Sequence, residues 1–537
     1  MAIVKVTVRI VILLTTGAIS ACGGGGGGGF VPPPTSPPPP GSGWQQGVFL
    51  DADTFIAKCA APRSGNHPIS GQPWPDMPGT TLDENNFLRS YSDDTYLWYD
   101  EIVDQDPGLF TEPLVYFDEL ITTALSPSGQ PKDKFHFTVP TDEWIQFSQS
   151  GVSFGYGVEW EFLSAAPPRQ ALVAYTEPNS PASDPPVSLA RGAELLFVDG
   201  VDFVNDNTQA GVDIVNAALF PTQAGEQHSF TIRDLGSPIT RAVTMTSAGI
   251  SLSPVQNVGF VATPTGNVGY MLFNAHIAVA EEGLVDAVNL LAAANVTDLV
   301  IDIRYNGGGF LALASQLAYM IAGAVPTAGQ TFELVQFNDK HPVTDPVTGA
   351  AISPTPFFNT TLGPPFPLPA GQALPTLNLP RVFVLTGPGT CSASEAVING
   401  LRGVDVEVIQ IGSTTCGKPY GFYATDNCGA SYFTIQFRGV NQKNFGDYSD
   451  GFSPANTQPV EGVPLPGCSV LDDFTKPLGD TTEARFQAAL VYRATQTCPI
   501  PSGFSPPGQL KTGAPPSAAD RTVAKPPWRL NRIMERK

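Results

Sequence analysis

Between residues 258 and 470, short apolar strands alternate with amphipathic helices. The strand-like runs are NVGYMLFNA at 267–275, LVIDIR at 299–304, RVFVLT at 381–386 and VEVIQIG at 406–412. This alternation predicts a mostly parallel sheet, because a strand that returns beside its neighbour in the same direction needs a crossover, which is usually helical. Functional sites of such sheets lie at the carboxyl ends of the strands. We therefore expect an α/β core whose functional residues follow its strands.

Two polar residues follow neighbouring strands of this core. Ser392 lies after the Gly/Pro turn that ends 381–386 and before the helix-forming run ASEAVINGL, and Lys418 ends the turn after 406–412. Because both turns open on the same edge of a parallel sheet, a hydroxyl and an amine 26 residues apart can meet there. Such a pair serves as nucleophile and general base, provided that burial lowers the lysine pKa enough to populate the neutral amine.

Backbone amides near Ser392 are suited to stabilise an oxyanion. The Ala393 amide lies at the start of the expected helix, where N–H groups are unpaired and the helix dipole is positive. Glycines 307–309 end the strand at 299–304, and glycine lets the backbone approach a substrate closely. We expect Gly308 and Ala393 to donate the two oxyanion hydrogen bonds.

Two further regions precede the core. Residues 45–150 carry aromatic side chains at helical intervals, as in NNFLRSYSDDTYLWYDEIV at 85–103, and these predict a mainly helical domain. Residues 151–253 change to short β-rich runs with turn signals and one helical run, VDIVNAALF at 212–220. This order resembles a PDZ domain, with Gly155, Tyr156 and Gly157 in the loop that binds a peptide carboxylate. A PDZ groove captures a C-terminal peptide as an added strand.

The first 22 residues predict export. Lys5 and Arg9 precede an apolar stretch that ends in Ile-Ser-Ala-Cys at 19–22. This ending resembles a bacterial lipobox and implies a lipid on Cys22; an ordinary cleaved signal peptide is the alternative. Residues 23–44 form a Gly/Pro-rich tether. We therefore expect a lipid-anchored protein of the cell envelope, and Gly23 after the cysteine favours the outer membrane, facing the periplasm.

The remaining cysteines predict disulfides, because an exported chain with an even number of them commonly pairs them. Cys416 with Cys428 would close the turn after Lys418, and Cys468 with Cys498 would fix the last helix; six cysteines allow 15 pairings. Cys391, beside Ser392, is interpreted as a packed or disulfide-bonded residue rather than a rival nucleophile. The chain has no C-x-x-C pair and its histidines are scattered. We therefore expect no bound metal and no cofactor.

Charge separates the body of the chain from its end. The formal charge of −21 argues against a nucleic-acid partner. Residues 499–537, in contrast, are Pro-rich and contain seven Lys/Arg against two acidic residues. This composition predicts a disordered tail, and an electrostatic contact with an anionic surface is the alternative.

The combined pattern resembles the C-terminal processing, or tail-specific, serine peptidase family over roughly 85–490. The matching segments are Gly269-Tyr270, Asp302 to Gly309, Ser392-Ala-Ser-Glu395 and Gly412 to Lys418. The resemblance implies a ClpP/crotonase-like core of βαβ units. It also implies that Ser392 is the nucleophile, Lys418 the base, and Gly308 and Ala393 the oxyanion donors. The implied activity is endopeptidase cleavage of exported proteins near their C-termini.

Three positions leave alternatives. Pro419 follows Lys418 where the family often has glycine. The family's helix-borne acidic partner would fall near Val404 or Asp405, so Asp405 is a candidate third residue. Tricorn-like relatives use a histidine, for which His276 is the nearest candidate; a structural or solvated histidine is the other interpretation.

The alternative to an enzyme is a non-catalytic envelope protein that binds peptides through the PDZ-like region. No oligomeric state is predicted.

Overall fold

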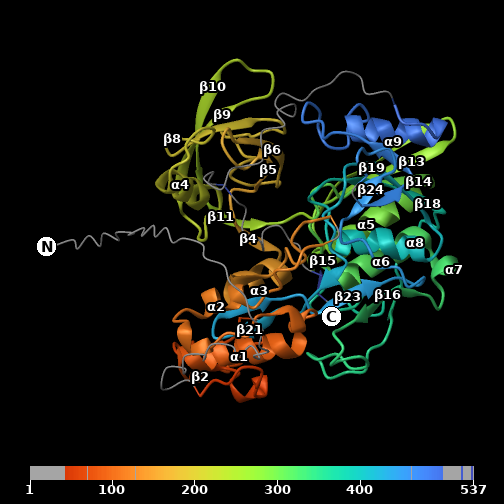
Figure 1. The fold of residues 1–537 in the computed structure, drawn as a ribbon. Coiled ribbons are helices and arrows are strands. Elements are labelled where there is room, and N and C mark those ends of the chain that lie inside the picture. The colour runs from red at the N-terminus through yellow and green to blue at the C-terminus, as the bar shows by residue number, and fades with distance from the viewer. Residues whose placement is uncertain are drawn as a thin grey trace, which may run out of the picture. The chain divides into compact units, whose positions relative to one another are not determined.

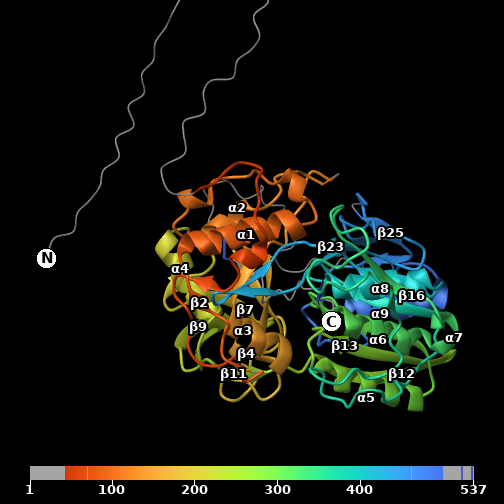
Figure 2. The same ribbon diagram turned by 90° about the horizontal axis from the view of Figure 1, so that it is seen from below.

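The computed structural model describes residues 43–499 except positions 69, 127 and 461, together with residues 522–523 and 534–535 (Figure 1 and Figure 2). The predicted signal peptide, Cys22, and most of the predicted tether and tail lie outside these residues. From Trp44 onward the chain forms one compact unit, and the domain boundaries within it remain predictions. Within the described part, no helix is both long and apolar enough to cross a membrane.

A six-stranded sheet forms the core, with strand order β12-β13-β14-β18-β19-β26. β12 is antiparallel to β13, and the other four pairings are parallel. The parallel sheet predicted from the alternating pattern is therefore present. The strands are β12 (Val255–Thr263), β13 (Gly266–Phe273), β14 (Val296–Asp302), β18 (Arg381–Thr386), β19 (Glu407–Gly412) and β26 (Gly467–Ser469).

Helices cover both faces of this sheet (Figure 1). On one face, α5 (Ala280–Ala293), α6 (Leu311–Ala322) and α8 (Ala393–Gly403) pack against side chains such as Met271 and Ile301. On the other, α9 (Ala484–Thr495) packs its Phe486 against Tyr270. Successive side chains of a strand point to opposite faces, which is why Tyr270 and Met271 belong to different layers. Residues that follow the strands therefore lie at a sheet edge between two buried layers.

Smaller sheets surround the core. A four-stranded sheet has the order β17-β16-β23-β20, a three-stranded sheet has the order β21-β22-β3, and β24 pairs with β25. Their bounds are β3 (Phe137–Pro140), β16 (Thr331–Gln336), β17 (Thr355–Pro356), β20 (Tyr420–Gly421), β21 (Thr425–Asn427), β22 (Ala430–Phe433), β23 (Phe437–Val440), β24 (Phe452–Pro454) and β25 (Val463–Leu465), with the short helix α7 (Ala324–Thr327) after α6.

Residues 152–251, here called the β-rich segment, form an antiparallel sheet of order β10-β9-β7-β6-β5, with β8 on β7. Val215 and Leu219 of its helix pack into the core of that sheet. The predicted β-rich character is present, and the assignment of a PDZ fold remains a prediction. The elements are β4 (Val152–Gly155), β5 (Val158–Ser164), β6 (Gln170–Thr176), β7 (Glu194–Val198), β8 (Val201–Asp202), α4 (Gln209–Leu219), β9 (Gln227–Arg233), β10 (Thr240–Thr246) and β11 (Ala248–Ser251), which pairs with β4.

The segment before residue 150 contains helices and short strands, one of which pairs with a strand from the C-terminal half of the chain. Helix α1 (Thr81–Thr95) begins at a capping box between Thr80 and Asp83 and is followed by α2 (Pro113–Glu119) and α3 (Thr141–Ile145). The helical period predicted over 85–103 ends at Thr95; beyond it Tyr96 is extended, Trp98 lies in a turn and Tyr99 begins a short 3-10 helix. β3 joins a sheet with β22, and β1 (Lys58–Cys59) pairs with β2 (Met77–Pro78). A helical domain of its own remains a prediction.

Three disulfides cross-link the described residues: Cys59–Cys428, Cys391–Cys416 and Cys468–Cys498. The predicted Cys468–Cys498 pair is confirmed. The predicted Cys416–Cys428 pair is wrong, because the turn after β21 brings Cys428 to the N-terminal segment while Cys416 reaches back to Cys391. Nearness in sequence therefore misled the prediction, because tertiary contacts determine which thiols meet.

Candidate active site

Ser392 occupies the turn between β18 and α8, directly before the first helical residue, Ala393. Its backbone has φ +58° and ψ −118°, in the left-handed half of conformational space. For a residue with a Cβ, such a conformation costs about 1–3 kcal/mol and persists only where the surroundings enforce it. The residue is fully buried, and its Oγ has no hydrogen-bond partner among the described residues. The hydroxyl is thus held at a helix start without being engaged there.

Lys418 follows β19 and is fully buried. Its Nζ lies 3.9 Å from the ring centroid of Phe422 and 5.0 Å from that of Phe135. Aromatic faces attract a cation, but they offer none of the hydrogen bonds that water gives an ammonium group. The amine therefore lies in an aromatic environment at the end of its strand, as the turn position predicts.

One carboxylate joins the two turns. Glu395 Oε2 accepts hydrogen bonds from the backbone N–H of Ser392 at 3.0 Å and from that of Lys418 at 2.8 Å. Its Oε1 accepts from the Gly417 N–H at 2.9 Å and from the Thr415 hydroxyl. Burial raises the pKa of Glu395, and these hydrogen bonds oppose that rise. The predicted convergence of Ser392 and Lys418 at one sheet edge is therefore present in their backbones.

The function of Glu395 was missed in the sequence, although a signal was there. Ser392 and Glu395 have the S-x-x-E spacing of a capping box, in which the acidic residue accepts from the backbone of the first residue. Only the fold shows that the same carboxylate also reaches Gly417 and Lys418, because these residues return from the next strand.

The Cys391–Cys416 disulfide is a second link between the same turns. Cys391 precedes Ser392, and Cys416 lies two residues before Lys418. With Glu395, the two cysteines are the one group among the described residues with the spacing of metal ligands. Because metals bind the thiolate form and both sulfurs are bonded to each other, this group does not fit a metal ion.

Gly308 lies against Ser392, as expected for a residue of an oxyanion hole. Its φ is +112°, and a Cβ at this position would come within 2.8 Å of Ser392 Cβ and 3.0 Å of the Ala393 amide nitrogen. Both predicted oxyanion donors therefore lie beside the serine. The Gly308 N–H donates to Asn306 Oδ1 at 3.0 Å, so an oxyanion that used this amide would replace that hydrogen bond.

Comparison with known proteins agrees with this geometry. Residues 267–422 match the model of peptidase family S41. This matched segment, residues 267–422, is here called the S41 domain. The predicted resemblance to the C-terminal processing serine peptidases is thereby confirmed.

Two relatives extend this match. The chain is 26% identical over 176 residues to the carboxyl-terminal-processing protease of Picosynechococcus sp., and 26% identical over 163 residues to carboxyl-terminal-processing peptidase 2, chloroplastic, of Arabidopsis thaliana. These matches cover 32% and 30% of this chain, and 40% and 29% of the relatives. The crystal structure of a putative S41 protease from Bacteroides fragilis has a TM-score of 0.53 and 21% identity, covering 79% of this chain and 98% of that one. The fold is therefore that of an S41 protease.

His276 supports the glycine segment of the S41 domain. Its Nδ1 lies 3.1 Å from Asn306 Oδ1, its backbone N–H donates to Gly308 O at 2.9 Å, and its carbonyl accepts from Phe310 at 2.7 Å. The residue is fully buried, and its Nε2 has no partner among the described residues. Burial lowers the pKa of His276 to about 3, so the ring is neutral. These contacts favour the structural interpretation of this histidine.

Asp405 is not brought to the site. It follows α8, an 11-residue helix that carries the chain roughly 16 Å away from its start at Ala393. Its side chain is 84% exposed and pairs with Lys443. Its candidacy as a third site residue is therefore a wrong prediction, because the helix between Ser392 and Asp405 separates them. Glu395 is the acidic residue at the Ser392 turn instead.

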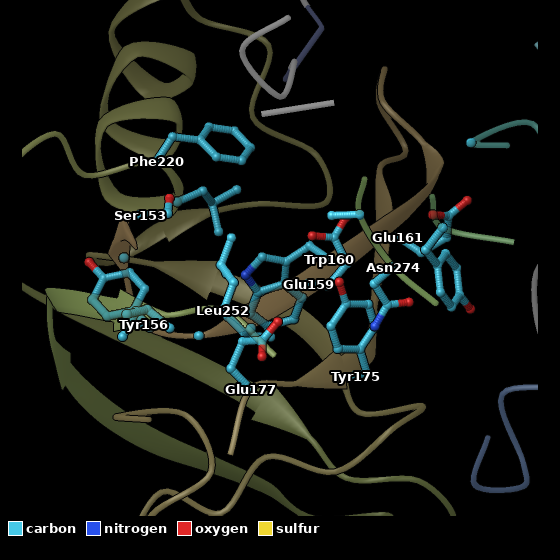
Figure 3. A pocket seen from close by; sticks show the side chains of 18 of the residues that line it. Ser153, Tyr156, Glu159, Trp160, Glu161, Tyr175, Glu177, Phe220, Leu252 and Asn274 are labelled. Carbon is cyan, nitrogen blue, oxygen red and sulfur yellow. The ribbon is translucent and has the colours of Figure 1, made fainter. Parts of the chain in front are cut away.

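A cavity of about 350 Å³ extends from the β-rich segment to the S41 domain (Figure 3). Gly155, Tyr156 and Gly157, the predicted peptide-binding loop, line one part of it. Pro388 and Gly389, which precede Ser392 by three or four residues, line another. The wall also includes Glu159, Trp160, Glu161, Tyr175, Glu177 and Asn274. Burial raises the pKa of Glu177 to about 7.

Buried charges fix the β-rich segment to the S41 domain beside this cavity. Arg191 donates to Asp472 at 2.5 Å and to the Tyr305 hydroxyl at 2.7 Å. Arg304, fully buried, pairs with Asp472 at 2.6 Å and with Glu483 at 2.9 Å. Tyr305 lines the cavity, so this network sets the position of one wall.

Proposed function

We propose that this protein is a serine endopeptidase in which Ser392 is the nucleophile and Lys418 the general base. The observation that carries the proposal is the shared Glu395 oxygen, which ties the backbones of both residues to one point. Relationship to the S41 peptidases supports it, as does the burial of both side chains.

In the proposed reaction, Ser392 Oγ attacks the peptide carbonyl carbon while neutral Lys418 Nζ accepts the hydroxyl proton. The Gly308 and Ala393 amides stabilise the oxyanion. The proton on Nζ then passes to the leaving amine as the C–N bond breaks, which leaves an acyl-enzyme. Water, deprotonated by Lys418, attacks the acyl-enzyme and releases the product acid and the serine.

We further propose that substrates are exported proteins, cleaved near their C-termini. The names of both relatives and the cavity at Gly155, Tyr156 and Gly157 support a PDZ-like segment that presents an extended C-terminal peptide to Ser392. The lipobox-like sequence supports attachment through Cys22 to the outer membrane, facing the periplasm. A non-catalytic peptide-binding protein is the less favoured candidate, because the matching family model and both relatives are peptidases.

Substitution of the two polar residues tests the proposal. We expect Ser392→Ala and Lys418→Ala to abolish cleavage of a model protein with an exposed apolar C-terminus, while the far-ultraviolet spectrum stays unchanged. Lys443→Ala, at a half-exposed surface lysine, is the matched control and keeps full activity. Mass spectrometry of the products maps the cleavage sites. Full activity in either Ser392→Ala or Lys418→Ala would overturn the proposal.

Lipid attachment at Cys22 is tested separately. In the export host, Cys22→Ala is expected to move the protein from the membrane fraction to the soluble fraction without changing its cleavage products. Retention of the variant in the membrane fraction would contradict lipid attachment at Cys22.

A further inference from the structure

The end of the chain returns to the S41 domain. Strand β27 (Met534–Glu535) pairs in parallel with β15 (Gly309–Phe310), with Met534 opposite Gly309 and Glu535 opposite Phe310 (β15 is labelled in Figure 1). Gly309 is the residue after Gly308, whose backbone lies against Ser392. β27 also contacts β20, which begins two residues after Lys418. A strand from the C-terminus therefore lies beside the glycine segment that touches Ser392 and near the strand that follows Lys418.

A second described part of the tail is anchored in the β-rich segment. Val523 is 1% exposed and packs in the hydrophobic core of that segment, among residues such as Phe203 and Phe230. Its backbone N–H donates to Ala165 O at 3.1 Å. The tail is thus attached both to the segment proposed to bind peptides and to the edge proposed to cleave them.

Charge favours the same attachment. Residues 499–537 hold seven Lys/Arg against two acidic residues, whereas the whole chain has a formal charge of −21. The cavity that joins the β-rich segment to the S41 domain is lined by Glu159 and Glu161. Opposite charge raises the local concentration of a basic peptide at such a surface.

We propose that the basic C-terminal tail of this chain is a ligand of its own active site. β27 occupies the strand position that a substrate peptide would take, and an extended peptide added to a sheet edge is a common mode of peptide recognition. This inference rests on the proposed peptidase function. Because the tail is tethered, its effective concentration at the site is on the order of millimolar, so external peptides must compete with it.

Crosslinking tests whether β27 lies beside β15 and β20, and this test does not depend on catalysis. The full chain carrying Ser392→Ala receives the photoreactive residue p-benzoylphenylalanine at position 534. The expected crosslinks lead to residues 309–310 and 420–421 of the same molecule. The matched control has the probe at position 510, in the tail but distant in sequence from β27, and is expected to yield neither. Failure to find these crosslinks overturns the inference, and crosslinks that join two chains overturn occupancy by the chain's own tail.

Kinetics tests whether the seated tail competes with substrate. Met534→Pro removes one backbone N–H of β27, and we expect the KM for an external peptide to fall at least threefold with kcat unchanged. Gln509→Pro is the control and keeps the wild-type KM. An unchanged KM in Met534→Pro contradicts competition. If neither the wild type nor the variant cleaves any peptide, the proposed function fails, while the crosslinks still decide whether the tail is seated.

Discussion

The backbone amides of Ser392 and Lys418 donate to the same atom, Oε2 of Glu395, at 3.0 and 2.8 Å. The relative position of the proposed nucleophile and base is thus set through their backbones by one buried carboxylate. The Cys391–Cys416 disulfide adds a covalent link between the same turns. Substitutions of Glu395 or of these cysteines can therefore test whether the spacing of the two turns matters, while both proposed catalytic side chains stay intact.

Replacement of Glu395 by glutamine is expected to lower kcat/KM at least tenfold. The neutral amide has one acceptor oxygen in place of two, so it cannot accept from Ser392, Lys418, Gly417 and Thr415 together. Peptide-cleavage assays measure this loss. The exposed Glu407→Gln is the control, and an undiminished kcat/KM in Glu395→Gln would show that the carboxylate does not position the pair.

The pH dependence of stability gives an independent test of Glu395. Burial raises its pKa in the folded protein above the unfolded value, so its stabilising contribution is complete below the unfolded pKa and is lost as pH rises through the folded pKa. Glu395→Gln lacks this titration. The free energy of unfolding of the variant, relative to the wild type, is therefore expected to increase with pH, as measured by urea denaturation from pH 4 to 8.

The disulfides are expected to separate stability from activity. Removing Cys59–Cys428 with a double serine substitution should lower the free energy of unfolding by about 2–5 kcal/mol while kcat stays near the wild-type value, because this link lies outside the site. Removing Cys391–Cys416 should lower kcat, because the turns of Ser392 and Lys418 lose a constraint. Denaturation curves and cleavage assays below the melting range make the comparison. Equal effects of both double variants on kcat would contradict it.

His276→Asn is expected to keep kcat/KM within tenfold of the wild type. The asparagine Nδ2 can replace the histidine Nδ1 as donor to Asn306, and a structural residue needs no titration for catalysis. Loss of more than a thousandfold in a folded variant would favour a histidine base.

The stability of the same variant checks the pKa of His276. Burial lowers this pKa from 6.5 to about 3, so the contribution of the neutral ring is present above pH 6.5 and is lost as pH falls toward 3. Between pH 6.5 and 3, the free energy of unfolding of the wild type should fall by up to about 5 kcal/mol more than that of the variant.

Glu177→Gln is expected to stabilise the protein at alkaline pH. The pKa of Glu177 is raised from 4.5 to about 7 by burial, so its contribution is complete below pH 4.5 and is lost as pH rises through 7. The contribution that is lost is about 3 kcal/mol of the free energy of unfolding. Glutamine can still accept from Ser253, which donates to this side chain at 2.9 Å. The variant and wild type should have equal melting temperatures near pH 4, and the variant the higher one at pH 9.

Local patterns in the chain were sufficient to predict much of the core. The apolar runs that became β13 and β18 each precede a helix, and those that became β14 and β19 each follow one, so their parallel direction follows from these crossovers. Ser392, Ala393, Gly308 and Lys418 were found because each ends or follows such a run. Their positions at one edge depend on the parallel direction of the strands, which is itself a consequence of the helical crossovers.

Contacts between distant segments were decided only by the tertiary structure. Cys59 meets Cys428 across 369 residues, and β27 meets β15 across more than 200, neither of which leaves a periodic trace in the sequence. The family resemblance makes Asp405 a candidate, but helix α8 lies between it and Ser392 and separates the two. The sequence by itself determined which strands and turns exist, because these depend on neighbouring residues. The fold decided that Glu395 would hold Ser392 and Lys418 together, because a buried carboxylate takes whichever amide donors the packed chain presents to it.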